Sequence, residues 1–279
     1  MKKNWYKGKV FIITGAGGDI GKEVCKLFAP LGMKIYLLDL PTMDLTSLKE
    51  ELYQLGADYV ENLPLDVINR EQIKDTIDFI VRKEKVIDIL FNNAGIGSKC
   101  SITNMGNFEE YRKIMSVNVD SMWMILQAAL PYFGRLAPTK KYPNRKIGQL
   151  IFSSSSAGKT GVPYMAAYAM SKSAIIALAN SIRLEFKMQN HKINVITSVS
   201  APAKTKFYST PEMIDWVKNY EKKGFLYKIV TPLDVAKRVL KASRKNKKEV
   251  FIPRWWKILD ILFVLSHSLI GKLLIEIER

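Results

Sequence analysis

The chain has 279 residues, of which 48% are hydrophobic, and it carries a formal net charge of +17. This length suits one large α/β domain or two small ones, and the hydrophobic fraction excludes a predominantly disordered protein. Cys25 and Cys100 have neither disulfide-like nor metal-like spacing, and His191 and His267 are isolated, so we predict no metal site and favour a reducing cytoplasmic compartment. The N-terminus lacks a signal-peptide pattern and leads directly into an apolar strand.

Short apolar runs alternate with longer helix-like stretches along the chain. The predicted strands are Val10–Thr14, Lys34–Leu38, Tyr59–Leu63, Ile87–Phe91, Gln149–Ser153 and Asn194–Ser198. Parallel strands need crossover connections and are buried on both faces, so this alternation predicts an α/β fold with a doubly wound parallel sheet. No linker divides the chain. We therefore expect a single domain over residues 1–252 with a C-terminal helical appendage over 253–279.

A glycine-rich turn follows the first predicted strand and opens a helix. It runs from Thr14 to Gly21 and contains Gly15, Gly17 and Gly18. Backbone amides at such a helix N-terminus can hold a pyrophosphate, and the glycines let the backbone approach it closely. The turn differs from the Gly-x-Gly-x-x-Gly fingerprint because Ile20 replaces the third glycine. The alternative is a flexible loop that binds nothing.

Asp39 ends the second predicted strand, where a carboxylate can accept hydrogen bonds from an adenosine ribose. Its charge would repel a 2′-phosphate, and Leu40 beside it offers no compensating cation. The position therefore favours NAD over NADP. A solvated loop aspartate is the alternative.

Tyr168 and Lys172 are separated by one helical turn, so their side chains project from the same helix face. A Lys ammonium beside the phenol favours its ionised form, which makes the phenol a usable proton donor and acceptor. Ser155 precedes this helix and can hold a carbonyl or alcohol oxygen against the phenol. The trio indicates hydride-transfer chemistry, and the alternative is a solvated lysine beside a half-buried tyrosine.

Five motifs occur in the order typical of one enzyme family. They are Thr14, Gly15 and Gly21 in the glycine turn, Asp66-Val67, Asn92-Asn93-Ala94-Gly95, Asn118, and the set Ser155, Tyr168 and Lys172. From about Lys9 to Ile252 the chain resembles the short-chain dehydrogenases/reductases, which implies a Rossmann-type fold. Asp19 departs from the family pattern, which has a glycine at that position.

The resemblance implies a role for each motif. Tyr168 would exchange a proton with the substrate oxygen while hydride passes between nicotinamide and substrate carbon. Lys172 would lower the Tyr168 pKa and bind the nicotinamide ribose, and Ser155 would orient the substrate oxygen. Asn118 would position a water that links Lys172 to solvent, unless it only staples a helix. The implied cofactor contacts are Gly15, Gly17, Gly18, Asp19, Ile20, Asp39, Asp66, Val67, Asn93, Ala94, Gly95, Tyr168, Lys172 and Thr205.

The segment after the sixth predicted strand departs from the family pattern, with Ser200-Ala201 where Pro-Gly is expected, but it keeps Thr205. Residues 206–230 occupy the place of the family's variable substrate lid. This segment is rich in aromatic and other large apolar residues: Phe207, Tyr208, Met213, Trp216, Tyr220, Phe225 and Tyr227. It suggests a roomy apolar pocket, although each of these residues could simply pack the lid onto the core. Thr231 followed by Pro232 predicts the start of a helix.

The positive charge is concentrated near the C-terminus, where twelve basic and only two acidic residues lie between Lys222 and Lys257. The tryptophan pair Trp255-Trp256 follows, and then an apolar segment to Ile277 with Lys257, Asp260, His267, Ser268 and Gly271 on one helical face. Its longest uncharged stretch is too short to span a bilayer. The pattern is typical of an interfacial anchor on anionic lipid. Burial against the domain or a second subunit, and a merely solvated basic surface, are the alternatives.

The leading hypothesis is an NAD-dependent oxidoreductase that interconverts a secondary alcohol and a ketone on an apolar, lipid-like substrate. A non-catalytic dinucleotide sensor and a membrane-associated scaffold with the same fold are the alternatives. We expect a cytoplasmic location with peripheral attachment to the inner face of a membrane, and no nucleic-acid partner because no reader motif occurs. The resemblance implies a homodimer through the helices around Ser121 and Ala174.

Overall fold

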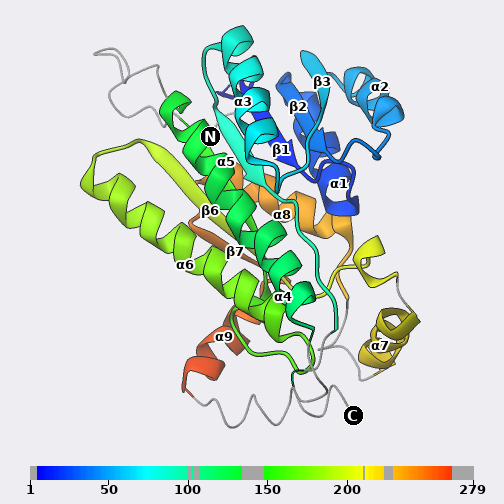
Figure 1. Ribbon diagram of the computed structural model, residues 1–279. Helices are drawn as coiled ribbons and strands as arrows, with labels where there is room; N and C mark the ends of the chain where they lie inside the picture. The colour runs from blue at the N-terminus through cyan, green and yellow to red at the C-terminus, as the bar shows by residue number, and fades with distance from the viewer. Residues whose placement is uncertain are drawn as a thin grey trace.

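The computed structural model describes residues 5–99, 102, 107–133, 148–209, 211–222 and 229–265, which build one parallel sheet (Figure 1). The strand order within these residues is β3-β2-β1-β4-β5-β6-β7, so the chain reverses direction across the sheet between β1 and β4. The strands are β1 (Val10–Thr14), β2 (Lys34–Asp39), β3 (Tyr59–Pro64), β4 (Ile89–Asn92), β5 (Gly148–Ser155), β6 (Ile193–Ser200) and β7 (Glu249–Ile252). In such a sheet, ligands bind beyond the carboxyl ends of the strands at this point of reversal.

Helices cover both faces of the sheet (Figure 1). One layer contains α1 (Asp19–Phe28), α2 (Thr46–Gln54) and α8 (Pro232–Lys245). The other contains α3 (Arg70–Glu84), α4 (Phe108–Met115), α5 (Ser121–Ala129) and α6 (Ala166–Met188). Two further helices, α7 (Pro211–Lys222) and α9 (Trp256–Leu265), lie near the carboxyl edge of the sheet, and α9 follows directly from β7.

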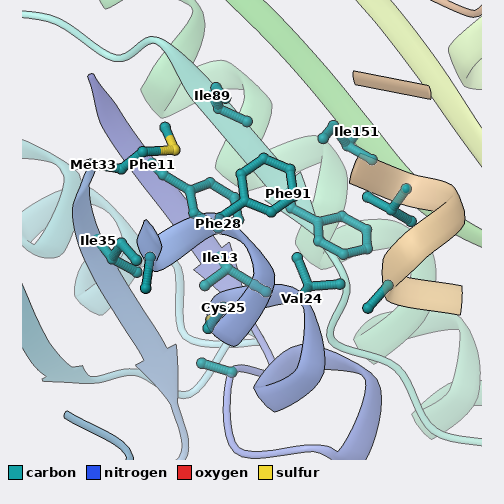
Figure 2. Close-up of a cluster of buried hydrophobic side chains, with 14 of the residues drawn as sticks. Phe11, Ile13, Val24, Cys25, Phe28, Met33, Ile35, Ile89, Phe91 and Ile151 are labelled. Carbon is teal, nitrogen blue, oxygen red and sulfur yellow. The ribbon is translucent and has the colours of Figure 1, made fainter. Parts of the chain in front are cut away.

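Each strand sends alternate side chains to opposite faces of the sheet, which creates two hydrophobic cores. Phe11 and Ile13 pack with Phe28 of α1 in one core, shown in Figure 2. Val10 and Ile12 point to the other core, which α3, α5 and α6 close. Cys25 is fully buried in the first core, whereas Cys100 lies outside the described residues. Burial on both faces explains why the strands are continuously apolar in sequence.

The predicted doubly wound fold is confirmed, and the six predicted strands differ from the observed ones only at their ends. The predicted strand at Ile87 begins later, at Ile89, because Ile87 forms an isolated bridge with Phe133. Strand β7 was not predicted, since its four residues lie within the basic segment and begin with Glu249. The predicted helix start at Thr231 is confirmed by a reciprocal cap in which Thr231 and Asp234 bond each other's backbone amides.

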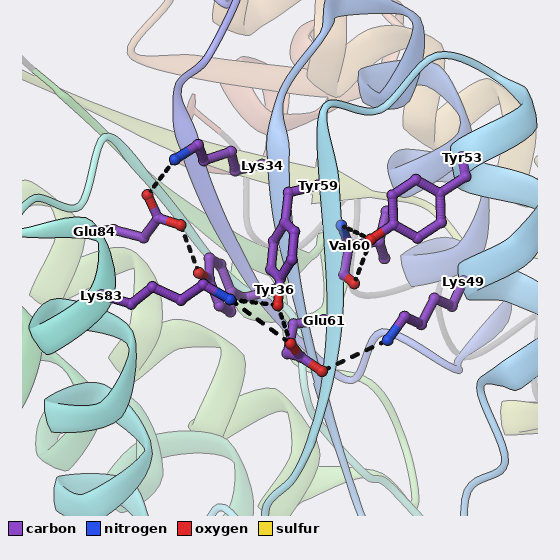
Figure 3. A network of polar contacts seen from close by, with 9 residues as sticks. All are labelled: Lys34, Tyr36, Lys49, Tyr53, Tyr59, Val60, Glu61, Lys83 and Glu84. Carbon is purple, nitrogen blue, oxygen red and sulfur yellow. Dashed lines mark hydrogen bonds and ion pairs between the residues drawn. The ribbon is translucent and has the colours of Figure 1, made fainter.

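Polar contacts hold the outer strands, away from the carboxyl edge (Figure 3). The Tyr53 hydroxyl accepts a bond from the Val60 amide at 3.0 Å and donates to the Val60 carbonyl at 3.1 Å, which satisfies backbone groups of the edge strand β3. Glu84 of α3 pairs with Lys34 at 2.6 Å and accepts a bond from Tyr36 at 2.7 Å. These contacts secure β2 and β3 without using the ends at which a ligand would bind.

Candidate active site

The loops after β1 and β4 are fastened to each other at the centre of the carboxyl edge. The Thr14 hydroxyl accepts bonds from the amides of Asn93 at 3.0 Å and Ala94 at 3.1 Å. The Asn93 side chain donates to the carbonyls of Thr14 at 3.2 Å and Gly15 at 3.0 Å. The Asn-Asn-Ala-Gly run and the glycine turn are therefore one hydrogen-bonded unit.

Two glycines of the turn, Gly15 and Gly21, lie where a side chain has no room. Gly15 has φ +64°, and a Cβ there would lie 2.9 Å from the Ala94 Cα. A Cβ at Gly21 would lie 2.2 Å from the Gly15 carbonyl oxygen. Gly18 caps helix α1 without a side-chain hydrogen bond. The first turn of α1 thus presents backbone amides without a side-chain acceptor on the cap, which fits the diphosphate of a dinucleotide.

Two carboxylates border this turn. Asp39, at the end of β2, accepts a bond from the Gly17 amide at 2.7 Å, which places it beside the turn as its sequence position predicts. Asp19, in the first turn of α1, accepts a bond from the backbone amide of Lys206 at 2.6 Å. Asp19 thereby ties the glycine turn to the segment after β6. It also puts a negative charge where the phosphates of a dinucleotide would approach.

Ser155, Tyr168 and Lys172 converge at the end of β5 and the start of α6. Burial raises the pKa of Tyr168 to about 12, and a hydrogen bond with the Ser155 hydroxyl partly offsets this rise. The Lys172 ammonium lies 5.5 Å from the centroid of the Tyr168 ring and donates to the Ser153 carbonyl at 3.2 Å. Burial lowers the pKa of Lys172 to about 8. In the protein alone, burial outweighs the expected lowering of the Tyr168 pKa by Lys172.

Ser154 and Ser155, two of the four consecutive serines, form different side-chain hydrogen bonds, and the Ser155 hydroxyl donates to the Ser200 carbonyl at 3.4 Å. Ser154 is buried and donates to the Lys172 carbonyl at 2.9 Å, which anchors α6 to β5. The Ser155 hydroxyl accepts a bond from the Ala157 amide at 3.2 Å and interacts with Tyr168. Ser155 is therefore the serine that faces the phenol, as its spacing predicts.

Asn118 lies in a π-helical turn, Ser116–Asp120, between α4 and α5, and its side chain is fully buried. Its amide nitrogen donates to the Ile96 carbonyl and the Ser171 hydroxyl, both at 2.9 Å, and its amide oxygen accepts from the Ile96 amide at 2.8 Å. These bonds use both amide hydrogens, so the side chain staples the loop after β4 to α6. A water in a relay could use only the remaining lone pair of the side-chain oxygen or the backbone.

A cavity of about 420 Å³ connects the glycine turn to Tyr168. Ten residues that the sequence predicts for cofactor binding or catalysis line this cavity: Gly17, Gly18, Asp19, Ile20, Asn93, Gly95, Ser155, Tyr168, Lys172 and Thr205. Gly15, Asp39, Ala94 and Asn118 support its walls. Asp66 and Val67 follow the outermost strand β3 and do not line this cavity, so an adenine contact by them stays a prediction.

Phe207 and Tyr208 of the predicted lid line the cavity, but the sequence did not predict their packing near Tyr168. Phe207 packs against the Tyr168 ring with a centroid distance of 5.3 Å, and Tyr208 packs against Phe207. Gly97 permits this packing, since a Cβ there would lie 2.5 Å from Phe207 and 2.7 Å from Tyr168. Lys22 and Lys206 line the end nearer the glycine turn. The Gly-x-Gly spacing of Gly95 and Gly97 was the available signal for this close approach.

Comparisons with known proteins agree with this geometry. A family model described as short chain dehydrogenase matches residues 9–211. The chain belongs to the short-chain dehydrogenase/reductase family. It is 30% identical to a 3-oxoacyl-[acyl-carrier-protein] reductase FabG of Thermotoga maritima over 68% of this chain and 73% of that protein. It is 27% identical to the mouse 17-beta-hydroxysteroid dehydrogenase 13 over 91% of this chain and 77% of that protein.

A solved structure shares the fold. A short-chain dehydrogenase/reductase from Burkholderia phymatum in complex with NAD superimposes with a TM-score of 0.76, at 21% identity and with 90% of each chain covered. As a family member the protein is an oxidoreductase that uses NAD(P) and acts on CH–OH and keto groups of small molecules. Short-chain dehydrogenases are commonly oligomeric.

Proposed function

We propose that the protein is an NAD-preferring dehydrogenase/reductase that interconverts a secondary alcohol and a ketone on an apolar, lipid-like substrate. The observation that carries this proposal is the convergence of Ser155, Tyr168 and Lys172 on a cavity that the glycine turn borders. NAD, when bound, accepts or donates the hydride. The protein's own groups handle the oxygen and the proton.

In the reducing direction, the Ser155 hydroxyl orients the carbonyl oxygen of the substrate and the Tyr168 phenol donates its proton to that oxygen as the carbon receives hydride. The neutral phenol is the resting form because of its raised pKa. Lys172 has a buried ammonium bonded to one carbonyl, so its other hydrogens remain for ribose hydroxyls of the cofactor. In the oxidising direction the same atoms exchange the proton in reverse.

The test of catalysis is Tyr168→Phe, which removes the phenolic proton and keeps the ring that packs on Phe207. NADH-linked turnover should fall by about two to four orders of magnitude, the usual contribution of a general acid. Retained NADH binding shows that the variant is folded. Unchanged turnover in this variant would contradict the catalytic assignment and favour a non-catalytic dinucleotide sensor or a scaffold.

The preference for NAD rests on Asp39, whose carboxylate the Gly17 amide holds beside the glycine turn. A 2′-phosphate on the adenosine ribose would meet this negative charge. NADH should therefore bind more tightly than NADPH in fluorescence titrations. The substitution Asp39→Ser should reduce the difference between the two dissociation constants. Tighter binding of NADPH by the unaltered protein refutes the preference.

The apolar character of the substrate rests on Phe207 and Tyr208, which close the cavity over Tyr168. We assign residues 206–230 as a substrate lid on a catalytic domain of residues 1–252. The side chains of Met213 and Trp216, and residues 223–228 with Phe225 and Tyr227, lie outside the described residues. In a screen over secondary alcohols, kcat/KM should rise with the length of the alkyl chain. A higher kcat/KM for the shortest alcohols would contradict the proposal of an apolar substrate.

We further propose that residues 253–279 attach the protein peripherally to the inner face of a membrane from the cytoplasm. Ile258, Ile261 and Leu262 of α9 are 60%, 52% and 40% exposed, so the described part of this helix presents apolar side chains to solvent. No described helix is both long and apolar enough to cross a bilayer. Residues 266–279, with His267, Ser268 and Gly271, lie outside the described part.

A tail variant with Ile258, Ile261 and Leu262 each replaced by serine tests this attachment. In vesicle flotation the unaltered chain should float with anionic vesicles and the tail variant should remain at the bottom, because burial of each large apolar side chain contributes about 1.5–3 kcal/mol. Equal flotation of both proteins contradicts attachment through α9.

We also propose a homodimer through α5 and α6, the helices that carry Ser121 and Ala174. Trp123 on α5 and Met170 on α6 are exposed and apolar, which suits a subunit contact. Analytical ultracentrifugation should show a dimer that Trp123→Asp converts to a monomer. If Trp123→Asp remains a dimer, the subunit contact does not involve this face of α5.

A further inference from the structure

A concave basic surface lies between α8, β7 and the start of α9, away from the catalytic cavity. Two adjoining cavities of about 340 and 620 Å³ share Arg238, Lys241 and Arg254 in their walls. We call this surface the basic groove, and its cations are Lys237, Arg238, Lys241, Lys245, Lys247, Arg254 and Lys257. None of its residues lines the catalytic cavity.

The cations gather because of the helical repeat of α8. Val235, Val239 and Ala242 face the sheet and are buried, so Arg238 and Lys241, one turn apart, are directed to the groove side. Among the groove cations on α8, Lys245 lies in the last turn, beside Arg244, where the negative helix C-terminus stabilises positive charge. Like charges at this spacing repel each other, so the arrangement lowers stability unless an anion is present.

The nearby carboxylates do not neutralise the groove. Glu249 pairs with Lys159 at 2.9 Å, outside the cation set. Asp234 accepts bonds from the Thr231 hydroxyl at 2.7 Å and the Thr231 amide at 3.1 Å as part of the α8 cap. Within the described parts of the chain, no carboxylate lies within ion-pair distance of Arg238, Lys241 or Arg254. Burial and repulsion by Arg254 lower the pKa of Arg238, and Asp234 only partly opposes this.

The groove opens next to apolar surface. Trp255 lines one of its cavities and lies 5.8 Å from Trp256, centroid to centroid. The exposed side chains of Ile258 and Ile261 follow on α9. Tryptophan and aliphatic side chains beside concentrated positive charge suit the boundary between phosphate headgroups and acyl chains. A second copy of the chain related by a two-fold axis would place the same cations against each other, which disfavours self-association here.

We propose that the basic groove binds the phosphomonoester headgroup of an anionic lipid. The proposal rests on the membrane attachment proposed above and gives it a headgroup preference. A phosphomonoester carries more than one negative charge near neutral pH and offers several acceptor oxygens to converging Arg and Lys donors. Arg254, at the junction of the two cavities, is placed to bind the phosphate while α9 contacts the acyl region.

The experiment compares vesicles of phosphatidylcholine with phosphatidic acid and vesicles of phosphatidylcholine with phosphatidylserine, matched in total negative charge. The full chain should bind the phosphatidic acid vesicles more tightly. The groove variant Lys241→Gln/Arg254→Gln should bind them at least about tenfold more weakly, and the matched variant Lys74→Gln/Arg82→Gln on α3 should stay within about twofold of the unaltered chain. Both variants lose the same net charge.

Three results would overturn the proposal: no binding of phosphatidic acid vesicles by the full chain, equal binding of the two vesicle types, or equal loss in the two variants. Displacement of the vesicles by single-stranded RNA that itself needs Lys241 and Arg254 would assign the groove to nucleic acid instead. If the tail variant binds normally and the groove variant does not, the groove stands and attachment through α9 fails. Turnover of a soluble alcohol without vesicles should be unchanged in the groove variant, which separates this test from the catalytic one.

Discussion

The glycine turn and the basic groove are two concave surfaces of one fold, but they are built in opposite ways. At the turn, buried hydrogen bonds from Thr14 and Asn93 fix the backbone and leave no room for a Cβ at Gly15. At the groove, long cationic side chains surround an open hollow, and the described carboxylates form no ion pair with Arg238, Lys241 or Arg254. The first surface is determined by backbone geometry, and the second by charge.

This difference separates two kinds of recognition. A site formed by backbone amides selects a ligand by its shape, and few substitutions preserve it. A site formed by several cationic side chains selects a ligand by its charge, and each single substitution there lowers the binding affinity only in part. Substitutions should therefore have large, position-specific effects on folding at the turn and small ones near α9.

The largest effect is expected for Gly21→Ala. The added Cβ would lie 2.2 Å from the Gly15 carbonyl oxygen, and neither backbone can move without breaking the contact between the loops after β1 and β4. We expect the free energy of unfolding, measured by urea denaturation, to fall by about 3 kcal/mol or more.

Gly18→Ala is the matched control in the same turn. Its added Cβ would lie 3.4 Å from the same oxygen, and its φ of −68° suits alanine. The loss should be about 1 kcal/mol or less. Equal losses in the two variants would show that chain flexibility, rather than close packing, determines the cost.

A smaller and pH-dependent effect is expected for Lys172→Met. Burial lowers the pKa of Lys172 to about 8 in the folded protein, below the ordinary lysine value of 10.5. Between these values the unfolded chain binds more protons, so the stability of the unaltered protein rises with pH across this window. At pH 7 the free energy of unfolding of Lys172→Met should exceed that of the unaltered protein by about 2 kcal/mol. Each unit by which burial lowers the Lys172 pKa corresponds to about 1.4 kcal/mol, and the loss of the lysine's hydrogen bond offsets part of this gain.

The advantage of Lys172→Met should shrink as the pH approaches 10. Lys187→Met, an exposed position on the same helix, should show no such trend. The raised pKa of Tyr168 acts in the opposite direction, but only above about pH 10, where the unfolded tyrosine ionises first. A constant difference between Lys172→Met and the unaltered protein from pH 7 to 10 would mean that Lys172 stays charged throughout.

The sequence predicted the backbone-determined surface far better than the charge-determined one. Gly15, Asp39 and Asn93 follow predicted strands, and they lie together at one edge because strand ends meet there in any parallel sheet; their contacts with a cofactor stay a prediction. Ser155 was placed at the site by its position before the helix of Tyr168 and by the family resemblance. Phe207 was not placed against Tyr168, because no periodic pattern records a contact between a loop and a distant helix.

The position of the basic residues in the sequence did not predict where their charges lie in the fold. The basic segment was visible, but its local pattern hid strand β7 and did not show that Arg238, Lys241 and Arg254 converge on one hollow. The bond between Asp19 and the Lys206 amide was also unpredictable, since it joins a helix start after β1 to a loop after β6, 187 positions apart in the chain. Both features depend on the tertiary fold alone.

Asp19→Asn tests whether that bond moderates cofactor affinity, with an effect of about 1 kcal/mol. The asparagine keeps an acceptor for the Lys206 amide and removes the negative charge near the dinucleotide phosphates. NADH should bind about fivefold more tightly in a fluorescence titration at low salt, and the gain should shrink at high salt. Asp58→Asn, exposed before β3, should change nothing. Unchanged or weaker NADH binding by Asp19→Asn contradicts the repulsion.

The smallest effect is expected for Ile261→Ser on α9. Because Ile261 is 52% exposed, its side chain contributes little to the core, and the free energy of unfolding without lipid should change by no more than about 0.5 kcal/mol. Val239→Ser on α8, fully buried in the first core, is the contrast and should lose about 2 kcal/mol or more. A comparable loss at Ile261 would mean that the apolar face of α9 is covered in solution by protein. The loss of flotation in the tail variant would then report unfolding of that contact rather than release from a membrane.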